Sequence, residues 1–325
     1  MKNNLYLGID TSNYTTSAAL CDETGTLVKS VKRPLPVKEG ECGLRQSDAL
    51  FAHVVNLPDV MREIQANLSD RRLCAVGFSA RPRDVEGSYM PCFRAGAAAA
   101  ATASAAAGLP LYDFSHQSGH IMAAVYSSGR TDYLKGDFAA FHISGGTSEL
   151  LYVTPKRDGF DIKLLGGTLD LHAGQVIDRV GVLLGLSFPC GPALETLALQ
   201  YTGERLKTKT CVFGYNYNLS GLENLAGRIF RDSGDKGKTA AYVIDFISDT
   251  IEKVTEHLLR EYPDLPVLYA GGVMSNSIIK EKLSGKFSAA FAEPEFSSDN
   301  AYGTALLCRA RHLSRKTAYK ERVIG

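Results

Sequence analysis

Two stretches of the chain follow one plan. Residues 5–31 read LYLGIDTSNYTTSAALCDETGTLVKSV, and residues 138–167 read FAAFHISGGTSELLYVTPKRDGFDIKLLGG. In each, an apolar strand ends at a turn rich in Ser, Thr or Gly, returns as an alternating strand, and turns again at charged or glycine residues. Both are predicted to be three-stranded meanders, and their similarity indicates a duplicated α/β protein with two lobes. Two unrelated meanders in one α/β chain remain the alternative.

Helical and strand patterns follow each meander. After the first we expect helices over 47–68, 93–107 and 116–127, and strands over 72–79 and 110–114. After the second we expect helices over 170–185, 191–201, 239–262, 275–284 and 299–316, and strands over 266–270 and 288–291. The alanine-rich run over 95–108 is too short to span a bilayer and is predicted to be a helix that lies close to a sheet.

Composition excludes several classes of protein. The 325 residues allow two domains, and 45 % hydrophobic residues indicate a buried core. A formal charge of +1 provides no overall field for nucleic acid or membranes. The seven scattered cysteines never form Cys-x-x-Cys, which argues against a disulfide framework or a thiolate zinc site. With no signal-peptide pattern, we expect a cytoplasmic protein with no membrane association.

Two turns are candidate phosphate sites. The second meander turns at Ser144, Gly145, Gly146 and Thr147, whose backbone N–H groups can point toward an anion. An ordinary hairpin turn explains the same residues. The first meander turns at Asp10, Thr11 and Ser12, which could serve a phosphate-bound metal or only satisfy the turn.

A histidine pair is the stronger chemical signal. His116 and His120 are four residues apart at the start of a predicted helix, so both imidazoles lie on one face within reach of one metal ion. No Glu adjoins the first histidine, so a metalloprotease is poorly supported. Solvent-facing or core histidines are the alternative. Asp299, before the last helix, is either an N-cap or a third metal ligand.

Further candidates are acids and glycines. Asp170 and Asp178, in the predicted helix that also holds Gly174, could face one cleft and hold ribose hydroxyls, or be solvated acids on a capped helix. Gly271 and Gly272 follow a strand and precede a helix, which is suited to nucleotide contact, although such turns are common.

The order of these segments resembles the TsaD family of threonylcarbamoyladenosine synthases, once called O-sialoglycoprotease-like proteins, over nearly the whole chain. The matching segments are LGIDTS (7–12), HQSGH (116–120), SGGT (144–147), LDLHAGQVIDR (169–179), LLGLSFPCGP (183–192), NLSGLEN (218–224), AGGVMSN (270–276) and SSDNAYG (297–303). The resemblance implies the duplicated actin/Hsp70/sugar-kinase fold, with two lobes around a nucleotide cleft. We expect an N-terminal lobe of residues 1–136, on which a helix over 300–325 packs, and a C-terminal lobe of residues 137–299.

The resemblance also implies a chemistry. His116, His120 and Asp299 would bind one iron or zinc ion. A threonylcarbamoyl-adenylate would contact the 144–146 turn, Asp178, Gly191 and Asn276. The reaction would transfer the threonylcarbamoyl group to N6 of a tRNA adenosine beside the anticodon and release AMP. Further expectations are TsaB-like and TsaE-like partners and a dimer. The local basic residues Arg81, Arg83 and Arg94 and the tail over 309–322 could contact tRNA phosphates, and a solvated terminal helix is the alternative.

The sequence departs from the family pattern at several positions. The family's Glu-Thr-Ser-Cys-Asp-Glu start is replaced from Asp10 onward, and Thr147, Gln175, Cys190 and Glu223 stand where His, Glu, Gly and Lys are usual. These departures indicate a divergent paralogue. They motivate two alternatives: an O-carbamoyltransferase-like enzyme with a small acceptor, and an inactive protein that binds a nucleotide.

Overall fold

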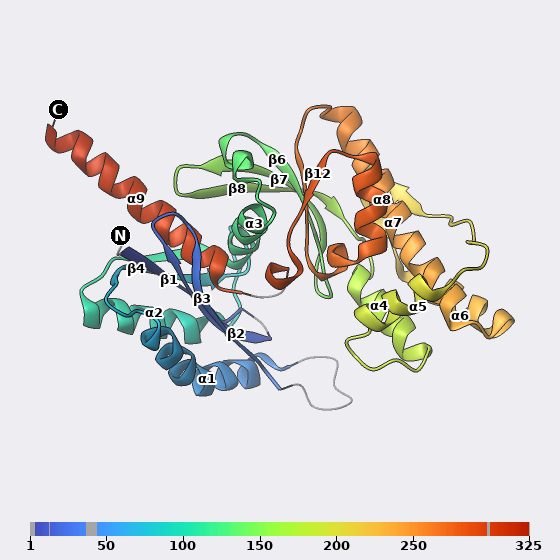
Figure 1. Cartoon of the computed structure of the whole chain (residues 1–325), viewed down its shortest axis with the longest axis horizontal. Coiled ribbons are helices and arrows are strands. Elements are labelled where there is room, and N and C mark those ends of the chain that lie inside the picture. The colour runs from blue at the N-terminus through green and yellow to red at the C-terminus, as the bar shows by residue number, and fades with distance from the viewer. Residues whose placement is uncertain (1–3, 13, 37–43, 298–299, 325) are drawn as a thin grey trace. The chain divides into compact units, whose positions relative to one another are not determined.

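The computed structural model describes residues 4–12, 14–36, 44–297 and 300–324. The chain divides into two compact units. The first combines residues 1–127 with the segments 155–161 and 298–325, and the second contains residues 128–154 and 162–297. Figure 1 labels many of the helices and strands of both units.

The first unit is built on a five-stranded sheet. Its strands are β1 (Asn4–Asp10), β2 (Thr15–Asp22), β3 (Leu27–Pro34), β4 (Arg72–Arg81) and β5 (Leu111–Ser115), in the order β3-β2-β1-β4-β5. β1, β2 and β3 pair antiparallel as the predicted meander, whereas β4 and β5 continue the sheet in parallel with β1.

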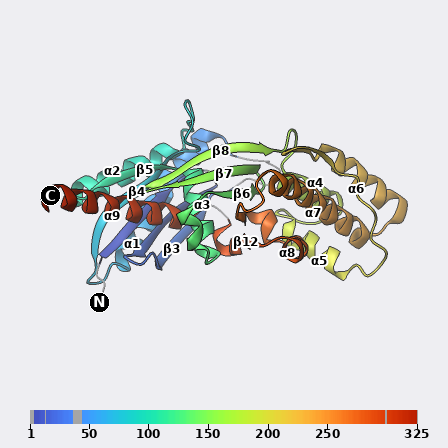
Figure 2. The ribbon, with the colours of Figure 1, turned by 90° about the horizontal axis from the view of Figure 1, so that it is seen from above.

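The helices of this unit cover both faces of the sheet. α1 (Gln46–Ala66) and α2 (Phe93–Ala107) contact one face, and α3 (His116–Ser127) and α9 (Tyr302–Ile324) lie on the other (Figures 1 and 2). α2 is the predicted alanine-rich helix and ends at Gly108, which has a φ of 61°. Small side chains let α2 pack close to β4 and β1.

The second unit repeats this topology. Its sheet has the order β12-β11-β6-β7-β8, with β6 (Phe138–Ile143), β7 (Ser148–Lys156), β8 (Gly159–Gly167), β11 (Val267–Ala270) and β12 (Ala289–Phe291). β6 pairs antiparallel with β7 and parallel with β11, as β1 does with β2 and β4. Two independent meanders would not share both the order of all five strands and the directions in which β6, β7, β11 and β12 pair, so the predicted duplication is confirmed.

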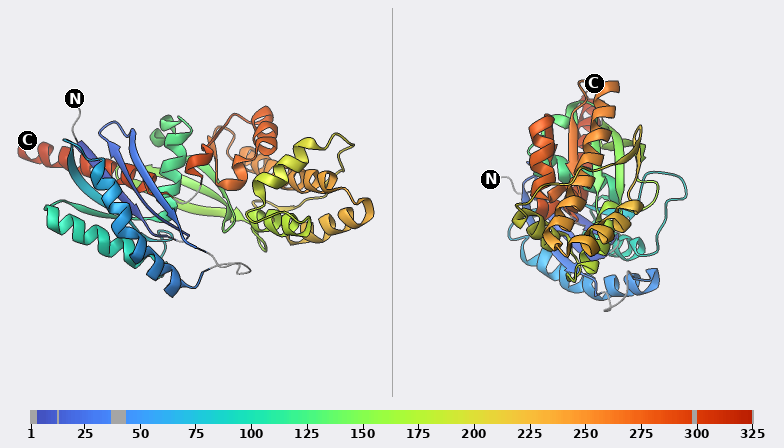
Figure 3. Two further views of the ribbon diagram at one scale, coloured as in Figure 1. Left: turned by 60° about the horizontal axis from the view of Figure 1, so that its bottom comes forward. Right: turned by 90° about the vertical axis from the view of Figure 1, so that its right-hand side faces the viewer.

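Helices gather beside the second sheet. They are α4 (Ala173–Leu183), α5 (Gly191–Gln200), α6 (Ser220–Ser233), α7 (Lys236–Glu261) and α8 (Ser277–Lys286), coloured from yellow-green to orange-red in Figure 3. Apolar side chains of α7, such as Ile244 and Ile251, share one buried core with Phe141 and Leu150 of the sheet.

Short elements complete the chain. They are the hairpin of β9 (Cys211–Phe213) with β10 (Asn216–Asn218), and the 3₁₀ turns Thr131–Lys135, Gly272–Ser275 and Pro294–Phe296. The hairpin and α6 were not predicted. Residues 233–238 contain the end of α6 and the start of α7, which are separated only by Gly234 and Asp235.

Candidate functional site

The histidine pair lies at the junction of β5 and α3 in the first unit. Ser115 ends the strand and His116 begins the helix, so no linker residue separates them. The Nε2 atoms of His116 and His120 are 2.8 Å apart, and their rings meet edge to face. The His116 side chain is 18 % exposed and residue His120 is 9 % exposed. The helical spacing therefore brings both imidazoles to one partly buried point, as predicted.

Asp10 holds the first histidine from the opposite side of the ring. Its Oδ2 lies 2.8 Å from His116 Nδ1, and it accepts further hydrogen bonds from Ser79 Oγ at 2.6 Å and Ser12 N at 2.8 Å. Burial alone would raise the pKa of the Asp10 carboxyl, but His116 and these hydrogen bonds lower it below its ordinary value. Asp10 is therefore an ionised acceptor, which places the proton of a neutral His116 on Nδ1.

This arrangement fits a metal ion. An imidazole that donates Nδ1–H to a carboxylate presents its Nε2 lone pair to the other side, as is usual for histidine ligands of metals. Imidazole nitrogens suit zinc and iron. Within the residues that the structure describes, no cluster of three His, Cys, Asp or Glu side chains is arranged to hold a metal. Asp299, the expected third ligand, lies outside those residues.

Thr11, the next residue of the first turn, hydrogen-bonds to the start of α2. Thr11 Oγ1 donates to the carbonyl oxygen of Cys92 and accepts from Gly96 N, both at 3.0 Å, so this hydroxyl caps the start of α2. Ser12 Oγ is buried, and among the described residues it has no hydrogen-bond partner. Of the two hydroxyls in the predicted phosphate turn, Ser12 Oγ is thus the one left to meet a ligand.

The glycine turns of the second unit converge where the parallel strands β6 and β11 end. A Cβ at Gly174, in the first turn of α4, would lie 2.7 Å from the backbone of Gly145. Gly271 has a φ of 98°, and a Cβ there would lie 2.3 Å from the carbonyl oxygen of Ile143. Any side chain at Gly174 or Gly271 would collide with this backbone. Glycine at these two positions therefore lets the start of α4 approach the 144–147 turn and lets the 271–276 segment approach the end of β6. Gly145, Gly146 and Gly272 are exposed.

Two polar residues in this region brace the turns. Asp178 Oδ1 accepts from Cys190 N at 2.8 Å, just before Gly191 begins α5. Burial raises the pKa of Asp178, and the Cys190 hydrogen bond opposes this only in part. Asn276 Oδ1 accepts from Ile278 N and Ile279 N at 3.1 Å and so caps α8. The α5 residue Glu195 accepts from Ser277 N at 2.7 Å, which joins the two segments.

Asp170 lies apart from this group. The helix begins at Ala173 rather than at residue 170, so the expected common helical face of Asp170 and Asp178 is wrong. The Asp170 carboxylate instead accepts from Leu219 N at 2.8 Å and from Ser220 Oγ at 2.6 Å. Burial would raise its pKa, but these hydrogen bonds lower the pKa below its ordinary value. Asp170 therefore holds the β10–α6 connection.

Two departures from the family pattern have local structural roles. Gln175 Oε1 accepts from His172 N at 3.3 Å and forms part of the capping box of α4. Glu223 pairs with Arg179 at 3.2 Å. Each side chain thus stabilises the start or the surface of a helix.

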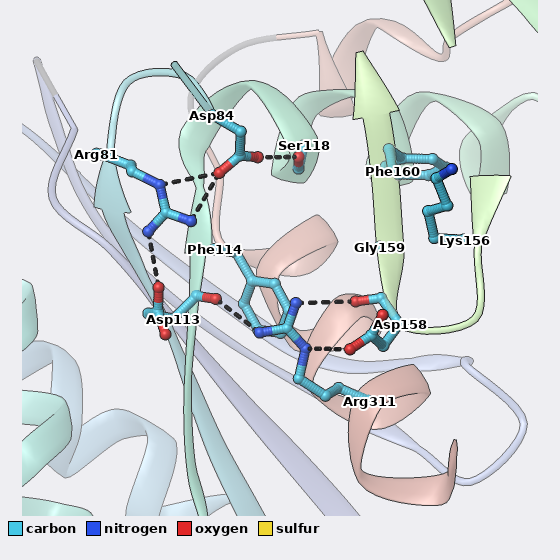
Figure 4. A pocket seen from close by; sticks show the side chains of 10 residues that line it. All are labelled: Arg81, Asp84, Asp113, Phe114, Ser118, Lys156, Asp158, Gly159, Phe160 and Arg311. Atoms are coloured by element: carbon cyan, nitrogen blue, oxygen red, sulfur yellow. Dashed lines mark hydrogen bonds and ion pairs between the residues drawn. The ribbon is translucent and has the colours of Figure 1, made fainter. Parts of the chain in front are cut away.

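A cavity of about 240 Å³ lies elsewhere in the first unit. Arg81 and Asp113 line one side, and Lys156 and Phe160 line the other, as Figure 4 shows. Arg311 donates to the carbonyl oxygens of Asp113 and Asp158 at 3.1 Å, so much of the polar lining is already paired. None of the predicted metal or nucleotide residues lines this cavity.

Comparisons with solved structures define the class of protein. The chain is similar to HypF from T. kodakarensis, with a TM-score of 0.62 and 13 % identity, over 98 % of this chain and 48 % of that chain. A full-length HypF in a phosphate- and nucleotide-bound form gives a TM-score of 0.56 and 12 % identity, over 94 % and 46 %. The chain spans about half the length of these two proteins.

A third structure is matched over nearly its full length. The activator of 2-hydroxyisocaproyl-CoA dehydratase from Clostridium difficile, with bound ADPNP, gives a TM-score of 0.51 and 11 % identity, over 97 % of both chains. These likenesses and the repeated sheets define a duplicated actin/Hsp70/sugar-kinase-like α/β fold. Residues 40–306 match the family TsaD, tRNA N6-adenosine threonylcarbamoyltransferase. The chain belongs to the TsaD family.

Proposed function

We propose that this chain transfers a threonylcarbamoyl group from threonylcarbamoyl-adenylate to N6 of a tRNA adenosine next to the anticodon. Family membership supports a threonylcarbamoyl-type transferase in general. One observation carries the finer proposal. His116 and His120 meet at their Nε2 atoms while Asp10 binds His116 Nδ1, which is an arrangement suited to a metal ion, and the proposed reaction depends on such an ion. One iron or zinc ion is the proposed cofactor.

The proposed roles follow from the geometry of each unit. His116 and His120 hold the ion through Nε2, and Asp10 fixes the orientation and tautomer of His116. When bound, the ion supplies positive charge that anchors and polarises the threonylcarbamoyl group. The exposed glycines Gly145, Gly146 and Gly272 of the two turns bind the adenylate phosphate through their N–H groups. Asp178, Gly191 and Asn276 complete the nucleotide contacts.

Nucleotide binding has a second line of support. The dehydratase activator was solved with ADPNP, and one HypF structure holds phosphate and nucleotide. A fold that binds nucleotides in these distant proteins supports an adenylate ligand for the same fold here. In the second unit, the turns meet at the carboxyl ends of parallel strands, where α/β proteins usually bind such ligands.

The acceptor and the partners are less constrained. Arg81, expected in a basic patch, pairs with Asp84 and Asp113, each at 2.7 Å, so it offers little charge to RNA. We propose that tRNA binds with the help of TsaB-like and TsaE-like partner proteins and that the chain forms a dimer. None of the helices in the described part of the chain is long and apolar enough to cross a membrane.

A small-molecule acceptor is the second candidate. Two residues that replace the family's usual ones make structural contacts: Gln175 caps α4, and Glu223 pairs with Arg179. A site with these changes supports an O-carbamoyltransferase-like reaction as the alternative to tRNA modification. An inactive nucleotide-binding protein is the third possibility, and one experiment separates all three.

The experiment combines purified protein with threonylcarbamoyl-adenylate, unmodified tRNA and candidate partner proteins. Mass spectrometry of the digested tRNA measures the modified nucleoside, and AMP release measures turnover. We expect modification by the wild type, loss of at least 100-fold in His120→Ala, and little change in His257→Ala, a control in α7 of the other unit. AMP release with an added small alcohol but none with tRNA would favour the second candidate. No release with either would favour an inactive protein.

A further inference from the structure

The start of α3 depends on one carboxylate that the sequence did not single out. Asp84 lies in the loop after β4 and is 36 % exposed at its side chain. Its Oδ2 accepts from Ser115 Oγ at 2.6 Å and from Ser118 Oγ at 3.1 Å. One oxygen atom therefore binds the last residue of β5 and a residue in the first turn of α3.

Arg81 fixes the other side of this carboxylate. Arg81 Nε donates to Asp84 Oδ1 at 2.9 Å, and its Nη1 donates to Asp113 Oδ2 at 2.7 Å (Figure 4). Hydrogen bonds to charged groups are the stronger ones, and an arginine held by two carboxylates has few orientations left. Asp84 is consequently held in place before it contacts α3.

The same loop and strand cap the helix backbone. Gln117 N donates to the carbonyl oxygen of Pro82 at 3.0 Å, and Ser118 N donates to Ser115 Oγ at 3.2 Å. Two N–H groups of the first turn, which have no acceptor within the helix, are thus satisfied from outside it. Since Ser115 Oγ also donates to Asp84, the carboxylate orients the hydroxyl that caps α3.

Asp84 contacts α3 on the side opposite the two histidines. Ser118 follows His116 by two residues, which is a rotation of about 200° around the helix. Asp10 accepts a hydrogen bond from His116 on one side of α3, and Asp84 accepts one from the Ser118 hydroxyl on the other. A rotation or shift of this turn would move both imidazoles together, because both are on α3.

We propose that Asp84 is a positioning residue that sets the rotation of the first turn of α3 and thereby the meeting of the two imidazole Nε2 atoms. This inference rests on the metal-binding role given to His116 and His120 under the proposed function. Asp84 touches neither histidine in the contacts described, so it acts through Ser115 and Ser118.

The test measures metal affinity without the reaction. Full-length protein is titrated with Co²⁺, whose visible absorption reports the ligand set. We expect Asp84→Asn to bind Co²⁺ roughly tenfold more weakly, the lower end of the effect of outer partners on metal sites, with an altered spectrum. Hydrogen exchange at the Gln117 and Ser118 amides should become faster. Ser118→Ala, which leaves the Asp84–Arg81 pair intact, should weaken binding in the same direction.

Asp113→Asn is the matched control. It is the same chemical change on the other carboxylate that Arg81 binds. The Co²⁺ affinity should stay within about twofold of the wild type, because Arg81 still pairs with Asp84 and Asp84 still accepts from Ser115 and Ser118. Wild-type affinity in Asp84→Asn, or an equal loss in Asp113→Asn, would overturn the inference and leave the proposed function standing. If wild type and His120→Ala bind Co²⁺ equally, the metal role fails and the inference fails with it.

Discussion

Gly303 marks the closest approach of α9 to α3, and its replacement by alanine tests how tightly these helices pack. A Cβ at Gly303 would lie 1.8 Å from the carbonyl oxygen of Gly119. It would also lie 3.0 Å from the backbone nitrogen of Ala123. Since ordinary Cβ contacts begin near 3.4 Å, the helices must separate by about 1.6 Å to hold one methyl group at ordinary contact.

The free energy of unfolding should fall substantially. Overpacking a core usually costs 1–3 kcal/mol and occasionally more. Here the obstruction is backbone on both sides, which cannot rotate away, so we expect about 3 kcal/mol or more. For a unit of this size, that lowers the thermal midpoint by roughly 6–12 °C. Because α3 carries His116 and His120, metal affinity should fall as well.

Thermal denaturation of the full chain measures the effect, and Gly285→Ala is the control. Gly285 lies in the last turn of α8, and among the described residues no atom comes within 4 Å of a Cβ there. Alanine is the better helix former by up to about 1 kcal/mol, so this variant should match or exceed the wild type. A Gly303→Ala midpoint within about 2 °C of the wild type would show that the two helices have room, and the packing argument would be wrong.

Three further predictions concern the second unit. The pKa of Asp170 is lower in the folded chain than its unfolded value of about 3.9. The ionised carboxylate therefore contributes its full stabilisation above that unfolded value, and this stabilisation is lost as the pH falls through the folded pKa. Asp170→Asn should therefore lose about 1–2 kcal/mol at pH 7, a loss that shrinks in acid and is visible as faster hydrogen exchange at Leu219. Asp178 has a raised pKa, so Asp178→Asn should raise the thermal midpoint at neutral pH but not in acid, while adenylate affinity by calorimetry falls; unchanged affinity would remove Asp178 from the site. Gln175→Ala should lower stability by about 1 kcal/mol through the lost cap, with urea denaturation as the check.

Elements with a strong local pattern were predicted closely. The alanine-rich run predicts α2 to its last residue, because helix propensity and the glycine that ends the helix are local properties. α6 was missed although it is a regular helix of 14 residues. Its start is held by Asp170, which is 50 residues away from Ser220 along the chain, and no local pattern contains that contact.

The candidate site also combines contacts that a local pattern predicts with contacts between residues far apart in the sequence. The spacing of His116 and His120 predicts their meeting, because four residues of helix fix it. Two contacts follow only from the folded chain. Asp10 orients His116, which is 106 residues away, and Asp84 accepts a hydrogen bond from Ser118 on the other side of α3. Asp10 was instead expected to serve a phosphate-bound metal or only to satisfy the turn, and the spacing of the residues gives no signal of its contact with His116.

The sequence alone therefore determined the two meanders, the alanine helix, the histidine pair and, through the order of its motifs, the TsaD family. These depend on periodicity, glycine positions and short spacings, which a chain carries wherever it folds. The tertiary structure decided which carboxylate meets which polar partner: Asp10 with the His116 imidazole, Asp84 with the Ser118 hydroxyl, and Asp170 with the Leu219 N–H group. Such pairs form only when strand order brings distant residues together, and a hydrogen bond is strong only over a few tenths of an ångström.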